Sequence, residues 1–189
     1  MVERALSWRP YPIAQVLSFE NTPMAMIRER GCLDRETWRR LFSYWQSKCV
    51  CGRPPSRSEI DPPIDIPSLA ANLMIVDIEP EGYRFRLVGS GITSRLGFDI
   101  TGSLLGTNGT DPAAVADFRS ASDIVAAVQK PRLLVAQYSG RQLARNLVLI
   151  LPLVRSSGET EKLLCGWFFD GDFKQGTRLQ GLSIVEIGL

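Results

Sequence analysis

Residues 83–92 read YRFRLVGSGI, and this stretch predicts one strand and the corner that follows it. In YRFRL, apolar residues alternate with arginines, which is the period-two pattern of a strand with one buried and one solvated face. Gly89 and Gly91 then end the strand, because glycine accepts backbone angles that strain other residues. An apolar turn and a second glycine-marked corner at residues 97–102 complete a small cradle over the predicted sheet.

Length and composition indicate an ordinary globular protein. The chain has 189 residues, of which 44% are hydrophobic and 22% charged, and this suits one domain with extensions. No apolar run approaches the roughly 18 residues that a membrane-spanning helix needs. The first four residues are not followed by the apolar core of a secretory signal. We therefore expect a cytoplasmic protein with no membrane association.

The chain contains no histidine. Catalysis by Ser-His-Asp or Cys-His, histidine-ligated haem and the usual catalytic zinc sites all require an imidazole. We therefore expect that the protein is not an enzyme, although chemistry by Asp, Tyr or Lys stays open.

Four cysteines stand at positions 32, 49, 51 and 165. They are too few and too scattered for a disulfide scaffold. The close pair Cys49 and Cys51 would supply only half of a metal or redox site, and no second close pair completes it. We expect free thiols and no bound metal.

The net charge of +2 is unevenly distributed, since residues 1–57 carry ten Lys or Arg and five Asp or Glu. This part therefore has a charge of +5, and the remainder has a charge of −3. A basic half can meet nucleic acid, but here no basic stripe alternates with aromatic residues. We interpret it as a solvated basic helix face and expect no nucleic-acid partner.

Residues 1–31 predict a loosely attached arm with a strand or turn at residues 13–17. Asp34 is a suitable N-cap for the first helix, because its carboxylate can accept hydrogen bonds from the first free amides. The helix carries one apolar stripe at i, i+3, i+4 and i+7: Trp38, Leu41, Phe42 and Trp45. The stripe predicts a docking face, either on the chain's own sheet or on a second copy, and we expect these residues to contact a dimer mate or partner.

A proline-rich connector follows at residues 52–67, and its five prolines favour extended turns. Residues 68–71 predict one helical turn. The β-rich run at 73–78 and the strand at 83–88 then form a hairpin across a turn.

Asp111 and Pro112 predict the start of a second helix, which Pro131 ends. Its inner side is marked by Val115, Phe118, Ser122 and Val125. Three further strands are predicted at residues 132–138, 143–153 and 163–169, and residues 182–187 alternate again as an added terminal strand. Two strands, then helices, then three strands imply an antiparallel sheet covered on one face, with a small-molecule groove under the longer helix.

This order of elements, together with several short motifs, resembles the PAS domain family, in particular a bacterial single-domain branch of poorly defined function. The resemblance covers residues 35–170. The segments that carry it are Leu41–Trp45, Pro54–Arg57, Ile60–Pro62, Asp65–Leu69, Phe85–Gly89, Gly97–Gly102 and Leu151–Leu153. It implies an α+β fold, with a five-stranded antiparallel PAS-like sheet that has helices on one face and is preceded by the N-terminal amphipathic helix.

The resemblance also implies a domain division and a role. We expect an arm at 1–31, the helix and connector at 32–67, a sensor domain at 68–170 and an extension with a terminal strand at 171–189. The implied role is sensing or regulation in bacterial signal transduction, through an unidentified small molecule, a protein partner or both, as a homodimer. The alternative is a pure protein–protein interaction adaptor with a filled core.

Cofactors known from the family fit the residues poorly. Haem in PAS sensors usually needs an axial histidine. A light-sensing flavin needs a reactive cysteine in an Asn-Cys-Arg-like motif on the helix, whereas Cys165 lies on a late strand. We expect no permanent cofactor, with haem and flavin both disfavoured.

A ligand under the longer helix would contact residues from the helix, the corner and the strands. The predicted lining consists of Phe85, Leu87, Ile92, Phe118, Val125, Tyr138, Arg145, Leu149 and Trp167, with Gln137 and Asn146 as further polar candidates. The alternative is that the apolar members are simply core and the polar ones face solvent. Asp99 and Thr101 are expected to brace the glycine corner.

Overall fold

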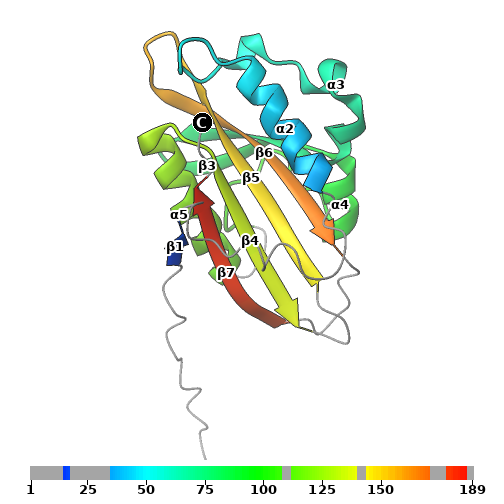
Figure 1. The fold of residues 1–189 in the computed structure, drawn as a ribbon. Helices are drawn as coiled ribbons and strands as arrows, with labels where there is room; N and C mark the ends of the chain where they lie inside the picture. The colour runs from blue at the N-terminus through cyan, green and yellow to red at the C-terminus, as the bar shows by residue number, and fades with distance from the viewer. Residues whose placement is uncertain (1–14, 18–34, 108–111, 140–143, 171–177, 187–189) are drawn as a thin grey trace, which may run out of the picture.

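The computed structural model describes residues 15–17, 35–107, 112–139, 144–170 and 178–186 (Figure 1). In chain order its elements are β1 Gln15–Leu17, α2 Arg35–Ser47, the 3-10 helix η1 Arg57–Glu59, α3 Pro62–Asp65, the 3-10 helix η2 Pro67–Asn72, β2 Leu73–Glu79, β3 Gly82–Val88, α4 Ser90–Leu96, α5 Pro112–Val128, β4 Arg132–Ser139, β5 Ala144–Val154, β6 Thr160–Asp170 and β7 Arg178–Glu186. Asp34 and Asp111, the expected helix caps, lie outside the described residues. Within the described part of the chain, no helix combines the length and the apolar character that crossing a bilayer demands.

The strands form one sheet in the order β1-β7-β4-β5-β6-β2-β3. The five strands from β4 to β3 pair antiparallel throughout, which confirms the predicted five-stranded sheet. The terminal strand β7 adds antiparallel to β4, and the short β1 adds parallel to β7. β1 falls within the segment predicted as a strand or turn, and β7 overlaps the predicted terminal strand at residues 182–187 but begins four residues earlier.

The two faces of the sheet carry separate apolar cores. α2 lies across β5 and β6 on the near face in Figure 1, whereas α4 and α5 contribute to the core on the far face. Val148 and Ile150 of β5 belong to the core under α5, and Leu149 and Leu151 belong to the core under α2. This burial on both sides explains why residues 147–154 are all buried and why no polar alternation marks the strand.

The apolar stripe of α2 packs on the chain's own sheet. Leu41 and Trp45 are fully buried, Trp38 is buried and Phe42 packs against the same core. The indole Nε1 of Trp45 donates a hydrogen bond to the carbonyl oxygen of Pro152 at 2.9 Å. The sequence left two docking surfaces open for this stripe, the chain's own sheet or a second copy, and in the structure the stripe packs on the chain's own sheet. These four side chains are therefore core residues of one chain and not a free pairing surface.

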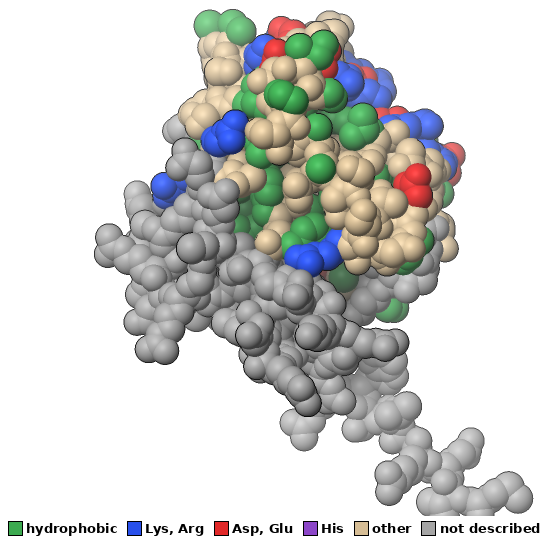
Figure 2. All heavy atoms as spheres, turned by 90° about the vertical axis from the view of Figure 1, so that its right-hand side faces the viewer, with side chains coloured by type: hydrophobic (Ala, Val, Ile, Leu, Met, Phe, Trp, Pro, Cys, Tyr) green, Lys and Arg blue, Asp and Glu red, His purple; other side chains and the backbone are tan. Residues whose placement is uncertain are grey.

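Seen from the side on which Figure 1 shows α3 and α4, hydrophobic side chains gather around a central hollow, and many charged side chains lie toward the upper and outer edges (Figure 2). Two large apolar side chains in or directly after these helices remain in contact with solvent. Ile64 of α3 is 74% exposed and Phe98, just after α4, is 43% exposed.

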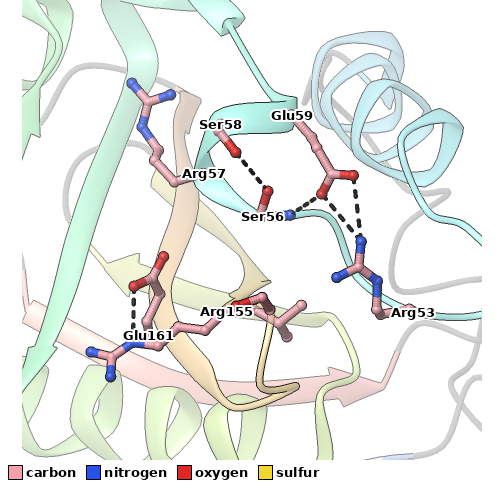
Figure 3. Close-up of a pocket in the computed structure, with 9 residues that line it drawn as sticks. Arg53, Ser56, Arg57, Ser58, Glu59, Arg155 and Glu161 are labelled. Carbon is pink, nitrogen blue, oxygen red and sulfur yellow. Dashed lines mark hydrogen bonds and ion pairs between the residues drawn. The ribbon is translucent and has the colours of Figure 1, made fainter.

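The connector is less extended than its prolines suggested. Pro62 and Pro63 occupy the first turn of α3, where a missing backbone N–H costs nothing. The amide of Val154 donates to the carbonyl oxygen of Pro55 at 3.0 Å, which ties the connector to the end of β5. A hollow opens between η1 and the β5–β6 turn (Figure 3).

The corner after β3 has a different cause from the one predicted. Gly89 has φ −67° and ψ 148°, which any residue can adopt. A Cβ at this position would instead lie 2.4 Å from the carbonyl oxygen of Ala71 in η2. Close approach of two backbone segments therefore requires this glycine, whereas Gly97 and Gly102, with φ near +80°, do use the left-handed freedom of glycine.

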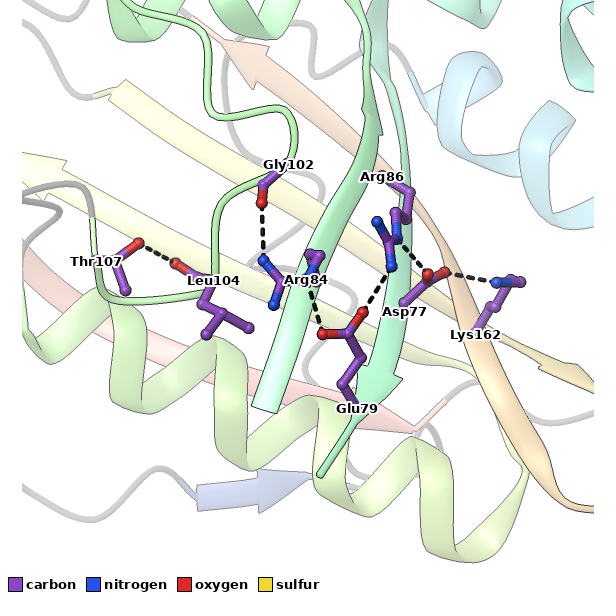
Figure 4. A network of polar contacts seen from close by, with 8 residues as sticks. All are labelled: Asp77, Glu79, Arg84, Arg86, Gly102, Leu104, Thr107 and Lys162. Carbon is purple, nitrogen blue, oxygen red and sulfur yellow. Dashed lines mark hydrogen bonds and ion pairs between the residues drawn. The ribbon is translucent and has the colours of Figure 1, made fainter. Parts of the chain in front are cut away.

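Charged side chains of β2, β3 and β6 form a network on the face opposite α5 (Figure 4). Asp77 accepts hydrogen bonds from Lys162 Nζ at 2.7 Å and from Arg86 Nε at 2.5 Å. Arg84 binds Glu79 at 2.7 Å and the carbonyl oxygen of Gly102 at 3.0 Å. Burial alone would raise the pKa of Asp77, but the hydrogen bonds from Lys162 and Arg86 outweigh it and hold that pKa below its usual value.

The core position of Trp45 predicts a large loss of stability on truncation. Trp45→Ala is expected to lower the free energy of unfolding by about 3–5 kcal/mol, because it removes a fully buried ring. Trp45→Phe keeps most of the ring but leaves the Pro152 carbonyl without its donor, at a cost of about 1–3 kcal/mol. Urea denaturation followed by circular dichroism measures both. Equal stability of Trp45→Ala and the wild type would contradict this packing.

The close approach at the corner predicts that two glycines respond differently to alanine. Gly89→Ala is expected to cost about 1–3 kcal/mol, because a backbone oxygen must move aside. Gly97→Ala is the matched control: open space surrounds its Cβ, so only its positive φ costs free energy, about 1 kcal/mol. A smaller loss for Gly89→Ala than for Gly97→Ala in thermal denaturation would show that η2 does not press on the corner.

The Asp77 network predicts a pH-dependent contribution to stability. Asp77→Asn is expected to lower the free energy of unfolding at pH 7 by about 1–3 kcal/mol. Because the folded pKa lies below the unfolded value of about 3.9, this contribution is complete above that value and disappears as the pH falls through the folded pKa. Urea denaturation at several pH values should show the two proteins converging in acid. Glu81→Gln, at an exposed carboxylate in the β2–β3 turn, should change stability little, and a pH-independent gap for Asp77→Asn would refute the linkage.

Candidate functional site

The core between α5 and the sheet is the candidate ligand site. α5 presents Phe118, Ala121, Ser122 and Val125 to the sheet, at the spacing of one helix face. The remaining buried members come from β2, β3, the corner, β4, β5 and β6: Met74, Val76, Tyr83, Phe85, Ile92, Ile100, Leu134, Val148, Ile150, Leu163 and Cys165.

Three contacts fix α5 over β3. The rings of Phe85 and Phe118 lie 6.3 Å apart between centroids. The hydroxyl of Tyr83 donates to Asp123 Oδ1 at 2.5 Å, and the guanidinium of Arg119 lies 6.0 Å from the centroid of the Tyr83 ring. Burial, followed by the hydrogen bond to Asp123, raises the pKa of Tyr83 above its usual range, so this hydroxyl stays protonated at neutral pH.

The corner closes one side of this core. The backbone of Phe85 makes two hydrogen bonds with residues 102–103, at the end of the corner. The Phe85 amide donates to the carbonyl oxygen of Ser103 at 3.0 Å, and the Phe85 carbonyl oxygen accepts from the amide of Gly102 at 2.6 Å. This segment covers the outer edge of β3, which would otherwise offer unpaired backbone groups. The amide of Thr101 donates to Asp99 Oδ1 at 2.8 Å, which confirms the predicted bracing role of Asp99.

Two buried polar atoms on this side of the sheet have no hydrogen-bond partner among the described residues. They are the hydroxyl Oγ of Ser122 on α5 and the indole Nε1 of Trp167 on β6. Ser122 is fully buried, and Trp167 packs against the same core beside Phe169. Because an unsatisfied buried donor is costly, such atoms mark places where a bound molecule or water can supply the missing bond.

The structure brings together five of the nine predicted lining residues. Phe85, Ile92, Phe118 and Val125 are buried members of the core, and Trp167 lies against it partly buried. The predicted Tyr138 and Arg145 lie in β4 and β5, but their side chains are outside the described residues, as are those of Gln137 and Asn146.

Leu87 and Leu149 were expected in this lining and lie elsewhere. A β-bulge in β3 pairs Leu87 with Ile75 but Phe85 with Val76, so Arg86 is the extra residue. The bulge turns Leu87 away from α5, leaves it 38% exposed and puts Val88 against the core instead. Leu149 faces α2, because its neighbours Val148 and Ile150 face α5.

Sequence reasoning placed Ser122 on the inner side of the helix but did not identify it as a site residue. One feature of the sequence could have identified it: Ser122 is a hydroxyl residue within the apolar stripe of Phe118, Ala121 and Val125. Trp167 was predicted as an apolar contact, whereas its unpaired N–H is the feature that now distinguishes it.

The described cysteines show no reactive arrangement. Cys165 is fully buried in the core, and burial raises the pKa of its thiol, so it stays protonated and unreactive. Cys49 is half-buried with a pKa raised by burial to about 11, and Cys51 is exposed. In the described ranges, no three His, Cys, Asp or Glu side chains are grouped so that they could hold a metal ion.

Several solved structures resemble this fold at low sequence identity. The PAS domain of BvgS from Bordetella pertussis matches with a TM-score of 0.44 and 18% identity over 58% of this chain and 81% of its own. VqmA bound to DPO matches with a TM-score of 0.41 and 14% identity over 54% of this chain, and the match spans about half (52%) of the VqmA chain. A light-oxygen-voltage domain studied with a flavin analogue matches with a TM-score of 0.41 and 17% identity over 57% of this chain and 82% of its own.

Sequence comparison identifies the family. No curated protein matches the chain. A sequence model of the PAS domain, however, matches residues 33–167, which includes α2, the connector and the sheet as far as Trp167 in β6. This is well over half of the chain, and it agrees with the extent of the resemblance deduced from the motifs. The protein therefore belongs to the PAS domain family, whose members are sensory and signalling modules.

Proposed function

We propose that this protein is a PAS-type sensory and regulatory protein of bacterial signal transduction, and that it holds a small molecule between α5 and the sheet. The observation that carries the proposal is the pair of buried, unpartnered polar atoms, Ser122 Oγ and Trp167 Nε1, on the side of the sheet that α5 covers. A purely structural core would gain stability from apolar atoms at these positions.

The surrounding residues define the chemistry of such a ligand. An indole N–H only donates, so Trp167 requires an acceptor on the ligand, whereas the Ser122 hydroxyl can donate or accept. The other neighbours are aliphatic or aromatic, so the body of the molecule is apolar. We propose a small, uncharged or weakly polar molecule with at least two polar groups.

The shared strands offer a path from this ligand to α2. β5 and β6 present alternate side chains to α5 and to α2, so a shift of Ile150 or Leu163 on one side displaces Leu151 or Leu164 on the other. The outer side of α2 is exposed and polar, with Arg39, Arg40, Ser43 and Gln46. We propose that a second copy or a signalling partner binds this outer side, because the inner stripe is core.

The proposal includes neither catalysis nor a permanent cofactor. Haem would lack a histidine ligand, since the chain has none. A flavin adduct would need a reactive thiolate, whereas burial keeps Cys165 as a thiol.

A protein-interaction adaptor without a ligand is the second candidate, and the tight centre of the core favours it. Phe85 and Phe118 contact each other directly, and Ala121 and Val125 beside them are fully buried. In that case Ser122 and Trp167 would be tolerated defects of an otherwise filled core.

Ser122→Ala separates the two candidates. Because the hydroxyl makes no hydrogen bond to the described residues, its removal should leave the stability of the ligand-free protein within about 0.5 kcal/mol or raise it slightly. Native mass spectrometry of protein isolated from its own cells should reveal a retained small molecule in the wild type. A thermal-shift series with that molecule should give a smaller rise in Tm for Ser122→Ala and for Trp167→Phe than for the wild type.

Ile60→Val is a control that changes the other core, under α2, and no residue of the candidate ligand site. It should lower the Tm of the ligand-free protein and retain most of the ligand-induced rise. A wild type that retains no molecule, together with a loss of more than about 1 kcal/mol in ligand-free Ser122→Ala, would refute the sensor pocket and favour the filled-core adaptor.

A further inference from the structure

A second hollow lies outside the core, between the connector and the turn that joins β5 to β6 (Figure 3). Its volume is about 740 Å³, and it is largely open to solvent. The connector contributes Arg53, Ser56, Arg57, Ser58 and Glu59, and the hairpin contributes Val154, Arg155, Ser156 and Glu161. None of these residues belongs to the core under α5, so this hollow is independent of the proposed sensor pocket.

The charges around the hollow do not cancel. Glu59 pairs with Arg53 at 3.4 Å, and Glu161 pairs with Arg155 at 3.0 Å. Arg57 has no carboxylate partner among the described residues, and its Nη1 donates to the carbonyl oxygen of Ile60 at 2.8 Å. One net positive charge therefore remains, carried by a guanidinium whose other N–H groups are available to a ligand.

Three serine hydroxyl groups also line the hollow. Ser56 and Ser58 point toward each other with their oxygens 3.0 Å apart, and Ser156 is exposed on the opposite side, in the β5–β6 turn. In Figure 3, Ser58 lies toward the upper edge of the hollow, Arg155 and Glu161 lie along the lower edge, and the Arg57 side chain starts beside Ser58 and points upward. Guanidinium groups with nearby hydroxyls are donors whose geometry suits the oxygens of a phosphate.

We propose that this hollow binds the phosphate group of a small phosphorylated molecule. Its volume is in the range of small-molecule sites, and its lining comes from two segments of the chain, the connector and the β5–β6 hairpin. A phosphate dianion would bind Arg57 and the serine hydroxyls and would attract Arg155, whose side chain is 59% exposed and so can turn from Glu161. The rest of the molecule would lie over the aliphatic stems of the arginines and Val154.

Binding would strengthen the junction between the connector and the sheet. A backbone hydrogen bond from Val154 to Pro55 already joins the two walls at 3.0 Å. A phosphate that contacts Arg57 on one wall and Ser156 or Arg155 on the other would join them a second time. The connector follows α2 directly, so the site would also stabilise the docking of α2.

The test is a titration of the full chain with inorganic phosphate and with adenosine 5′-monophosphate at constant ionic strength, followed by amide chemical shifts. Saturable shifts are expected at residues 53–59 and 154–161. Adenosine and potassium chloride, which lack a phosphate, should produce none. Arg57→Gln should raise the dissociation constant for both phosphate compounds at least about tenfold, because a charge-assisted hydrogen bond is lost.

Two further variants keep the test decisive. Ser156→Asp adds a negative charge at an exposed turn position and should weaken binding by a similar factor, even if Arg57→Gln fails to fold. Arg40→Gln removes the same charge from exposed α2, away from the hollow, and should bind like the wild type.

Non-saturable shifts, or equal dissociation constants for the wild type, Arg57→Gln and Ser156→Asp, would overturn the proposal. Binding of a phosphorylated peptide or an oligonucleotide, but of neither small phosphate, would also overturn it in favour of a macromolecular partner. Each of these outcomes leaves the Ser122 experiment unaffected, because the two sites share no residue.

Discussion

The burial of β5 and β6 on both faces is the constraint on which the rest of the structure depends. Residues 147–154 are buried without a break, so both α2 and α5 are needed to cover them. Each helix therefore rests on side chains that alternate along the same two strands. A change in the packing of one face therefore strains the same strands on which the other face packs.

The sequence predicted the order of elements well, because period-two and helical patterns are local properties. The hairpin of β2 and β3, the helix α5 and even the terminal strand β7 lie where these patterns placed them. The orientation of single side chains was harder to predict. Leu87 was misplaced because a bulge adds one residue to β3, and Leu149 because an unbroken apolar run contains no polar residue that marks either face.

Interactions between distant segments account for the remaining differences. Gly89 is needed because Ala71 lies against it, which no local angle preference could reveal. The missing partners of Ser122 and Trp167 appear only when α5 covers the sheet. The hollow at Arg57 and Arg155 likewise requires the connector to meet a turn about a hundred residues later in the chain. Residue type alone gave no reason to group these side chains.

The position of α2 is where the two proposed sites meet. Its inner stripe rests on β5 and β6, which also contact the core under α5, and its C-terminal end leads into the connector that borders the second hollow. A ligand in either site would favour one arrangement of α2 by its difference in affinity between the docked and displaced states. Two ligands that both prefer docked α2 must then strengthen each other's binding by the same factor, since this coupling is reciprocal. If both proposed ligands bind, this domain would respond to each of them through one structural change, the docking of α2 on the sheet.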